Sequence, residues 1–439
     1  MTDSPDLLIR GGRVIDPADG FDQVADLLVR AGRVEARGRD IAAPDGARQF
    51  DADGLVVAPG LVDPHCHLRT PGGEHKETIE SGARAAAAGG FTTVVAMANT
   101  NPVVDHPAVL RDIQERARGA CVRIAQLASI SIGLEGRQLS DMGRLAAAGA
   151  IGFSDDGIPV ASARLMRTAF EYATRFDLPV SNHAEDPTLI AGASMHEGHV
   201  SARLGLIGAP HQAEEIMLER DLRLARLTGC RYHALHISSG GSVEILDRAR
   251  AGGVRVFAEV SPHHLTLTDE LIAGEGEHAF DSQAKVNPPL RSRDHVDALR
   301  AGLAAGAFDL IGTDHAPHAE HEKLAPFEEA PSGFSGFETA LGMMLSVVAD
   351  GVLELPDLLA MMTINPARLY GLPGGTLAAG AAADIVAIDT DRTWKVDRWR
   401  FRSRGKNSPL HGKTLPGRAV ATWVDGESVF EIESPAARS

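Results

Sequence analysis

The sequence predicts an α/β protein, a (β/α)8 TIM barrel with a small β-sandwich domain formed by the N- and C-terminal segments. Two observations predict it: the middle of the chain alternates short apolar runs with Ala- and Leu-rich helical stretches, and both ends contain short apolar runs separated by glycine turns. The chain has 439 residues. Because a single hydrophobic core stops growing at about 250 to 300 residues, we expect one large and one smaller domain.

Each of eight apolar runs in the middle of the chain ends in a polar or histidine-containing cluster. Eight strand and helix units in succession are the pattern of a (β/α)8 barrel, in which the active site lies at the carboxyl ends of the strands. Polar residues that close a run are therefore candidates for chemistry. The clusters lie at 65–67, 99–101, 129–131, 154–156, 183–186, 236–239, 261–264 and 314–318.

The two ends of the chain share a sequence pattern that the middle lacks. Residues 7–16 and 25–34 read as short strands with glycine turns, and residues 383–389 and 419–426 repeat that pattern. We expect the ends to pair into one small β domain. The predicted boundaries are 1–57 for its first part, 58–368 for the barrel and 369–439 for its second part.

Composition and charge exclude several classes of partner. The formal charge of −16 opposes non-specific binding to nucleic acid or to an anionic membrane. The sequence has no run of about 18 apolar residues and no signal-peptide pattern at its start. Three cysteines, an odd number spread far apart, favour a reducing compartment. We therefore expect a cytoplasmic protein without nucleic-acid or membrane partners.

Histidines and an aspartate close several of the barrel runs. His65 and His67 are two residues apart on one run, so both imidazoles point to the same side of a strand. A lone histidine such as His183 or His236 is more often a packed residue than a ligand. Because each closes its own run on the edge that also carries Asp314, the set together predicts a metal site.

The ligand set is too large for one tetrahedral ion. One or two Zn²⁺ ions are expected per subunit, and two ions bridged by a carboxylate would use the whole set. Asp155 and Asp156 compete for the bridging position, and spacing does not choose between them; a turn or a helix cap is the alternative for this pair. The predicted metal ligands are His65, His67, one of the pair Asp155 and Asp156, His183, His236 and Asp314.

The remaining candidates are expected to be structural. Cys66 points to the opposite side of its strand from the two histidines and is expected to pack against the helices. His233, on the same run as His236, is expected to pack or to support a ligand. Solvated positions are expected for His75, His106, His196, His199 and His211.

With these residues assembled, the chain resembles the amidohydrolase superfamily and, within it, the bacterial type I dihydroorotases, nearly from end to end. An HxH pair alone is shared by the whole superfamily, whereas HxHxR together with NPPLR and GTDHAPH is specific. The segments that carry the resemblance are VDPHCHLR at 62–69, ANTNP at 98–102, FSDDG at 153–157, HAED at 183–186, HISS at 236–239, KVNPPLR at 285–291 and GTDHAPH at 312–318.

The resemblance implies roles position by position. It assigns the six metal ligands given above, with Asp156 in place of Asp155 as the bridge. It also implies that Arg69, Asn99 and His318 bind a substrate carboxylate, that Asn287 contacts the ring, and that the backbone near Ser332 and Gly333 contacts the pyrimidine edge. The position of Arg69 independently supports its implied role. A guanidinium on the same strand face as the HxH pair can form two parallel hydrogen bonds with a carboxylate.

The sequence lacks a lysine that many relatives use to bridge two metals, and it differs from the family at Thr70. Related hydantoinases, allantoinases and other dihydroorotases bridge two metals with a carboxylated lysine, yet no lysine occurs between Lys76 and Lys285. Either Asp156 bridges the metals or the site holds one. Thr70 stands where the family more often has a glutamate, and the sequence does not predict its effect.

The implied activity is reversible hydrolysis of L-dihydroorotate to N-carbamoyl-L-aspartate in de novo pyrimidine biosynthesis, by metal-activated hydroxide with Asp314 as the proton shuttle. Residues 319–330 are expected to form either a mobile lid or a solvated loop. The rival functions are hydrolysis of another cyclic amide, such as a hydantoin or allantoin, and an inactive homologue that scaffolds a partner. A homodimer and an association with aspartate transcarbamoylase are the partner hypotheses.

Overall fold

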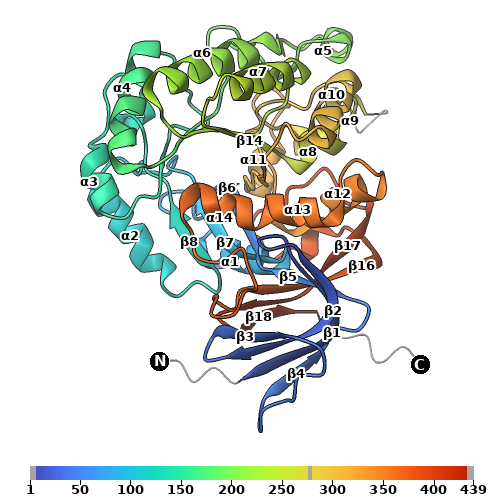
Figure 1. The fold of residues 1–439 in the computed structure, drawn as a ribbon. Helices are drawn as coiled ribbons and strands as arrows, with labels where there is room; N and C mark the ends of the chain where they lie inside the picture. Colours follow the sequence, from blue (N-terminus) through green and yellow to red (C-terminus); the bar gives the residue numbers. More distant parts are fainter. Residues whose placement is uncertain (1–5, 275–278, 433–439) are drawn as a thin grey trace.

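The N- and C-terminal parts of the chain pair into one β-sheet in the computed structural model, which describes residues 6–274 and 279–432 (Figure 1). The strand order is β18-β17-β16-β5-β1-β2-β3, with β4 also pairing with β1. The two ends meet where β5 pairs antiparallel with β16. The strands are β1 (Leu7–Asp16), β2 (Phe21–Arg30), β3 (Arg33–Gly38), β4 (Arg48–Asp51), β5 (Val56–Pro59), β16 (Ile385–Lys395), β17 (Thr414–Val424) and β18 (Glu427–Glu431).

The core of this end sheet explains why both segments are needed to form it. Leu27 and Val57 from the first part pack in one cluster with Ile385 and Trp423 from the last part. Trp423 is fully buried, and its ring meets Phe50 edge to face at 4.9 Å between centroids. Because neither segment alone could bury these side chains, the predicted pairing of the two ends is favoured by apolar burial.

Parallel strands of the middle segment follow one another in chain order. One group runs β6-β7-β8 and another runs β9-β10-β13-β14-β15. Parallel bridges between Ala128 and Phe153, and between Cys66 and His315, connect the two groups at both ends. The strands are β6 (Leu61–Cys66), β7 (Phe91–Ala96), β8 (Arg123–Gln126), β9 (Phe153–Ser154), β10 (Val180–Asn182), β13 (Tyr232–Ala234), β14 (Val256–Val260) and β15 (Leu310–Ile311).

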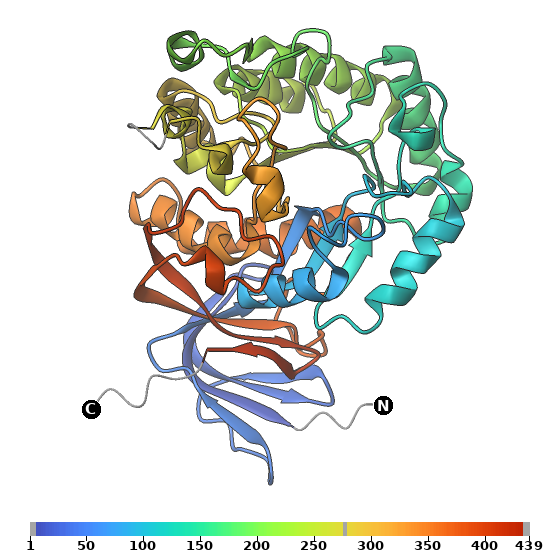
Figure 2. The same cartoon turned by 180° about the vertical axis from the view of Figure 1, so that it is seen from behind.

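Helices alternate with these strands and cover them on the outside (Figures 1 and 2). They are α1 (Ile79–Ala88), α2 (Pro107–Ala117), α3 (Met142–Ala147), α4 (Ala163–Ala173), α5 (His199–Leu204), α6 (Gln212–Thr228), α7 (Gly240–Ala251), α8 (Pro262–Thr266), α9 (Glu270–Ala273), α10 (Arg293–Ala304), α11 (Glu320–Lys323), α12 (Phe337–Ala349), α13 (Leu355–Met362) and α14 (Ile364–Tyr370). Short 3-10 turns occur at η1 (Ile132–Leu134), η2 (Thr174–Phe176), η4 (Ser282–Ala284) and η5 (Arg398–Arg400), and β11 (Met195–His196) pairs with β12 (Gly208–Ala209).

Local sequence signals set the helix boundaries. Thr78 caps α1, where its hydroxyl accepts a hydrogen bond from the Ser81 amide and the Ser81 hydroxyl accepts one from the Thr78 amide. Ser162 caps α4 in the same way by accepting from the Leu165 amide. Within residues 6–274 and 279–432, no helix is both long and apolar enough to cross a membrane.

Candidate active site

The six predicted metal ligands gather at the carboxyl ends of the parallel strands. Because neighbouring strands run in the same direction, the residues that follow them meet at one edge. All six are buried, with at most 8% of any one exposed. They are His65 and His67 at the end of β6, Asp156 after β9, His183 after β10, His236 after β13 and Asp314 after β15.

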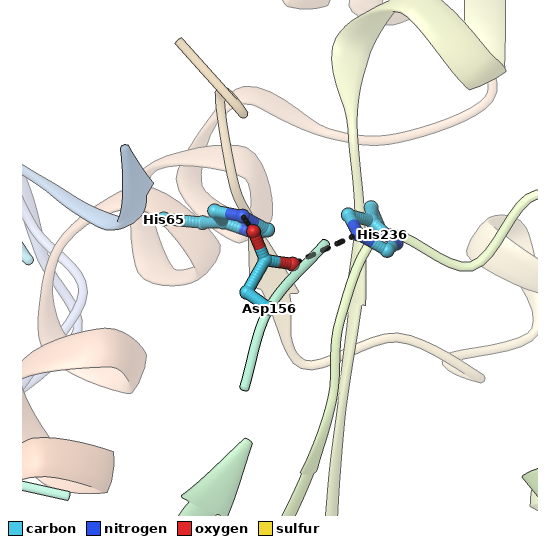
Figure 3. Close-up of side chains that lie close together, drawn as sticks. All are labelled: His65, Asp156 and His236. Atoms are coloured by element: carbon cyan, nitrogen blue, oxygen red, sulfur yellow. Dashed lines mark ion pairs between the residues drawn. The ribbon is translucent and has the colours of Figure 1, made fainter. Parts of the chain in front are cut away.

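Asp156 lies in the middle of the cluster and turns its two oxygens toward different histidines. Its Oδ2 is 3.6 Å from His65 Nε2 and 3.3 Å from His67 Nε2. Its Oδ1 is 3.5 Å from His236 Nε2 and 3.8 Å from His183 Nδ1. Figure 3 shows the Asp156 carboxylate between His65 and His236. A carboxylate placed in this way can bridge two cations.

Asp314 lies beside the HxH pair. Its Oδ1 is 3.3 Å from His67 Nε2 and 3.6 Å from His65 Nε2. These three residues form a second potential ligand group, which shares His65 with the group of His65, Asp156 and His236. Asp314 has a φ of 46° and His236 a φ of 30°. Such left-handed backbone is costly for residues other than glycine and is typical of functional sites, where the surrounding structure holds it.

Burial and neighbouring charges oppose each other in setting the charge state of the cluster. Burial raises the pKa of Asp314, but the hydrogen bond from His67 and the charge of His65 lower it to about 2. Burial likewise raises the pKa of Asp156, whereas His65 and His236 bring it well below its usual range. Both side chains are therefore carboxylates at neutral pH, and they need positive charge beside them.

The residues present fit a metal centre. His65 Nε2 and Asp156 Oδ1 are buried and have no hydrogen-bond partner among the described residues, although such atoms are costly to leave unpaired. His183 Nδ1 and His236 Nε2 lie 2.9 Å apart, which requires either a shared proton or a cation that both nitrogens face. Imidazole nitrogens with carboxylate oxygens are ligands that Zn²⁺ and neighbouring first-row ions prefer.

Asp155 and Asp156 take different roles in the structure. Asp155 turns away from the histidines, and its carboxylate accepts hydrogen bonds from the backbone amides of Ile130 and Ser131 at 2.7 and 3.1 Å. Burial raises the pKa of Asp155 to about 6. Asp155 ties the end of β9 to the loop after β8, and Asp156 alone of the two faces the histidine cluster.

Sequence reasoning missed Glu259, a buried carboxylate on β14 beneath the cluster. His65 Nδ1 donates to its Oε1 at 3.0 Å, and so does the backbone amide of His236 at 3.0 Å. His233 Nε2 lies 3.2 Å from its other oxygen. These contacts direct His65 Nε2 toward Asp156. The available signal was an acidic residue inside the apolar run 256–260, which is unusual unless the carboxylate has buried partners.

Glu259→Gln is expected to weaken metal binding by about 10- to 100-fold, as is typical when a partner of a ligating histidine is changed. The glutamine keeps the shape of the side chain but has one acceptor oxygen in place of two. His65, the His236 amide and His233 now share the two carboxylate oxygens of Glu259. Competition with a chelating dye measures the affinity. Glu244→Gln, on an exposed position of α7, is the matched control. Equal metal affinity in Glu259→Gln and the control would contradict the orienting role.

A cavity of about 350 Å³ opens beside the cluster. Arg69 lines it and donates through Nε to the Pro317 carbonyl at 3.2 Å. Asn99 accepts from His67 Nδ1 at 2.9 Å. Asn287 reaches within 3.2 Å of His183 Nε2. The predicted substrate-binding residues that line the cavity are Arg69, Asn99, Asn287, Ser332 and Gly333.

His318 differs from the other predicted substrate contacts, because it is not among the residues that line this cavity. Its Nε2 donates to the Ser332 carbonyl at 2.8 Å, and Lys76 Nζ donates to its Nδ1 at 3.3 Å. Burial, Arg69 and Lys76 lower the pKa of His318 to about 2, so the imidazole is neutral. His318 lies 3.3 Å from the Arg69 guanidinium and contacts the residues that line the cavity.

Lys285 and Lys323 attach the segment 319–330 to the cavity wall. Lys285 lines the cavity and donates to the carbonyls of Phe327 and Glu328 at 2.7 and 2.9 Å. Lys323 is buried and donates to the carbonyls of Pro331 and Gly333 at 2.8 and 3.1 Å. Sequence reasoning assigned neither lysine a role. The segment carries the short helix α11 and is not uniformly solvated, while the predicted lid motion stays a prediction.

The prediction for His196 was wrong, because this residue on β11 is buried and lies 3.4 Å from the guanidinium of Arg291. Its burial depends on this contact with Arg291, which is 95 residues away in the sequence and which no local pattern predicts. Of the other histidines expected to be solvated, His75, His106 and His199 are exposed and His211 is partly exposed. Cys66 is buried, and its thiol donates to the Val95 carbonyl at 3.3 Å.

Two family models match the chain. One is described as Dihydro-orotase-like and matches residues 54–242, and the other is described as the Amidohydrolase family and matches residues 227–430. Together with the strand-end cluster of histidines and aspartates, they define the protein as an amidohydrolase, a hydrolase of cyclic amides.

Two curated relatives of the chain are dihydroorotases, one kind of amidohydrolase. A dihydroorotase of Pelotomaculum thermopropionicum is 48% identical over 426 residues, which cover 97% of this chain and 98% of the relative. A dihydroorotase of Syntrophus aciditrophicus is 46% identical over 427 residues, which cover 97% and 99%. The chain belongs to the dihydroorotase family, which confirms the resemblance predicted from its motifs.

Solved structures show the same fold. An L-hydantoinase (dihydropyrimidinase) from Arthrobacter aurescens is 29% identical and superposes with a TM-score of 0.87, covering 98% of this chain and 97% of the other. A dihydropyrimidinase from Brevibacillus agri is 23% identical with a TM-score of 0.84, covering 97% and 95%. The second likeness shows the fold alone.

Proposed function

We propose that this protein catalyses the reversible hydrolysis of L-dihydroorotate to N-carbamoyl-L-aspartate in de novo pyrimidine biosynthesis. The observation that carries the proposal is the Asp156 carboxylate, whose two oxygens face two different pairs of histidines beside the cavity that contains Arg69. The family membership narrows the reaction to this cyclic amide.

The proposed architecture is a (β/α)8 barrel with an end domain of the β-sandwich type. Parallel pairing from β6 to β15, and the bridge from His315 back to Cys66, support the closed barrel. The pairing of β5 with β16 supports one domain built from both chain ends. We place the domains at 1–57, 58–368 and 369–439.

The proposed metal centre holds two Zn²⁺ ions. Asp156 would bridge them, with His65, His67 and Asp314 on one side and His183 and His236 on the other. When bound, such ions polarise an amide carbonyl and make water more acidic. The two unpartnered atoms that face the cluster, His65 Nε2 and Asp156 Oδ1, support this assignment.

Protein side chains supply binding and proton transfer. The Arg69 guanidinium binds the substrate carboxylate through two parallel hydrogen bonds, and Asn99 assists it. Asn287 and the backbone of Ser332 and Gly333 hold the ring in the cavity. His318, as a neutral donor to the Ser332 carbonyl, positions that backbone, and its contact with the substrate carboxylate stays a prediction.

Asp314 moves the proton that the hydrolysis requires. Its carboxylate oxygen accepts a proton from the attacking water and then delivers it to the ring nitrogen as the C–N bond breaks. Because the pKa of Asp314 is held low by His67 and His65 against the effect of burial, the carboxylate is ionised at the start of the reaction. In the direction of synthesis, Asp314 takes the proton from the ureido nitrogen instead.

A panel of cyclic amides tests the substrate. We expect kcat/KM for dihydroorotate to exceed that for hydantoin and for dihydrouracil by at least about 100-fold, because a ligand without the carboxylate leaves the buried charge of Arg69 unpaired. Steady-state rates for the three compounds on one enzyme preparation give the ratio. Faster turnover of hydantoin than of dihydroorotate would identify a hydantoinase, the activity named for the Arthrobacter relative.

The cytoplasmic location, the homodimer and the association with aspartate transcarbamoylase stay predictions. The three cysteines Cys66, Cys121 and Cys230 are free in the structure, and a reducing compartment would keep them so.

A further inference from the structure

A second cavity, about 830 Å³ in volume, lies between the end sheet and α12 and shares no lining residue with the active-site cavity. Figures 1 and 2 show β16 and β17 running beside α12. Arg392 and Trp394 enter the cavity from β16, Arg418 from β17, and Glu338 from the first turn of α12.

The cavity concentrates positive charge on an acidic protein. Five cations line it, and in the part of the chain that the structure describes none of them forms an ion pair with a carboxylate. They are Arg392, Lys395, Arg400, Arg402 and Arg418. A protein with a formal charge of −16 would be expected to pair its arginines, so a cluster left unpaired in a concave site points to an anionic ligand.

Each of the three carboxylates that line the cavity has a hydrogen-bond or ion-pair partner other than the five cationic side chains. Glu431 pairs with Arg48 on the end sheet. Asp397 accepts a hydrogen bond from the Trp399 amide at 3.2 Å. Glu338 accepts from the backbone amides of Arg402 and Ser403 at 2.5 and 3.3 Å, and burial raises its pKa to about 7.

The Arg418 guanidinium is subject to repulsion from the neighbouring arginines Arg392 and Arg400. Its Nε is buried and has no hydrogen-bond partner among the described residues. Burial lowers its pKa, the positive charges of Arg392 and Arg400 lower it further, and the charge of Glu338 raises it in part. Three guanidinium groups therefore influence one another within one cavity. An anion bound among them would relieve this repulsion and supply the missing acceptors.

Aromatic side chains give the cavity a second kind of surface. Trp394, Phe401 and Phe430 line it. The Arg418 guanidinium lies 4.8 Å from the centre of the Trp394 ring, and the Trp394 indole is fixed by donating to the Gly417 carbonyl at 2.9 Å. Guanidinium groups match phosphate oxygens in geometry, and aromatic rings can stack on a base. The volume lies within the range of small-molecule sites, about 300 to 1,000 Å³.

We propose that this basic cavity binds a polyphosphate anion, with Arg392, Arg400 and Arg418 contacting the phosphates. The aromatic wall beside them leaves room for the base of a nucleoside triphosphate. Inorganic tripolyphosphate and a nucleotide share the phosphate chemistry, and comparison of the two separates the contribution of the base.

Isothermal titration calorimetry without dihydroorotate tests the site independently of the enzyme's substrate. Tripolyphosphate, ATP and UTP are titrated as magnesium complexes, so that the probes do not withdraw the active-site metal. The test variant is R392Q/R400Q, which changes two partly or fully exposed arginines and leaves Arg418 packed on Trp394. Arg164→Gln, on an exposed position of α4, is the control for loss of positive charge.

We expect saturable binding of at least one probe to the unmodified protein and to Arg164→Gln, and at least about tenfold weaker binding to R392Q/R400Q, because charged hydrogen bonds to phosphate are lost. Dihydroorotate turnover without probes should be equal in the three proteins, which shows that the variant is folded. Tighter binding of ATP or UTP than of tripolyphosphate supports a nucleotide, and equal binding supports polyphosphate recognition alone. Absence of saturable binding, or equal binding to R392Q/R400Q, overturns the proposal, since the second result would place the anion at the active-site metals.

Discussion

Asp314→Asn is expected to lower kcat for dihydroorotate by at least about 100-fold, the contribution typical of a positioned general acid and base. The asparagine amide keeps an oxygen that can face His67 but cannot take up the proton of the attacking water. The change leaves Asp156 and the histidines in place, so metal content should fall less than turnover. Steady-state kinetics and elemental analysis of the same sample measure both quantities.

Asp247→Asn is the matched control for Asp314→Asn, because Asp247 lies on an exposed position of α7. Its turnover and metal content should equal those of the unmodified protein. Two results would contradict the proton-transfer role of Asp314. One is full activity of Asp314→Asn, and the other is a loss of activity that strictly follows a loss of metal and disappears when metal is restored.

Arg69→Met is expected to raise KM for dihydroorotate by about 100-fold, because the buried carboxylate of the substrate would lose two charged hydrogen bonds. The effect on kcat should be smaller, since the carboxylate is bound in the ground state and in the transition state alike. Arg69 lines the cavity, and its Nε donates a hydrogen bond to the Pro317 carbonyl. This hydrogen bond fixes the orientation of the guanidinium group.

Arg69→Lys separates charge from geometry at this position. A lysine retains the charge but not the planar fork, so it should recover part of the affinity and not all of it. Hydantoin has no carboxylate, and its slow turnover should change little in either variant. An unchanged KM for dihydroorotate in Arg69→Met would refute the assignment of Arg69.

Much of the site follows from local patterns. The spacing of His65 and His67 within an apolar run predicts two imidazoles on one face, and parallel strands bring the residues that close other runs to the same edge. For that reason the sequence alone predicts that His183, His236 and Asp314 lie together. The pairing of the chain ends was predictable on the same grounds, from strand-like runs that lack partners nearby in sequence.

Other features depend on contacts that no local pattern contains. β9 is only two residues long, so alternation along a strand does not say whether Asp155 or Asp156 faces the cluster. The choice is made by the amides of Ile130 and Ser131, which bind Asp155. Glu259 is 194 residues from His65, and His196 is buried by Arg291, so tertiary packing decides both.

The central claim is a two-metal centre, bridged by Asp156, that hydrolyses dihydroorotate. Its most direct test is titration of the metal-free protein with Zn²⁺, with dihydroorotate turnover and bound metal measured on each sample. The account predicts that turnover is absent without metal and reaches its plateau at two ions per chain. Full turnover in the metal-free protein, or a metal-loaded protein that does not hydrolyse dihydroorotate, would contradict it.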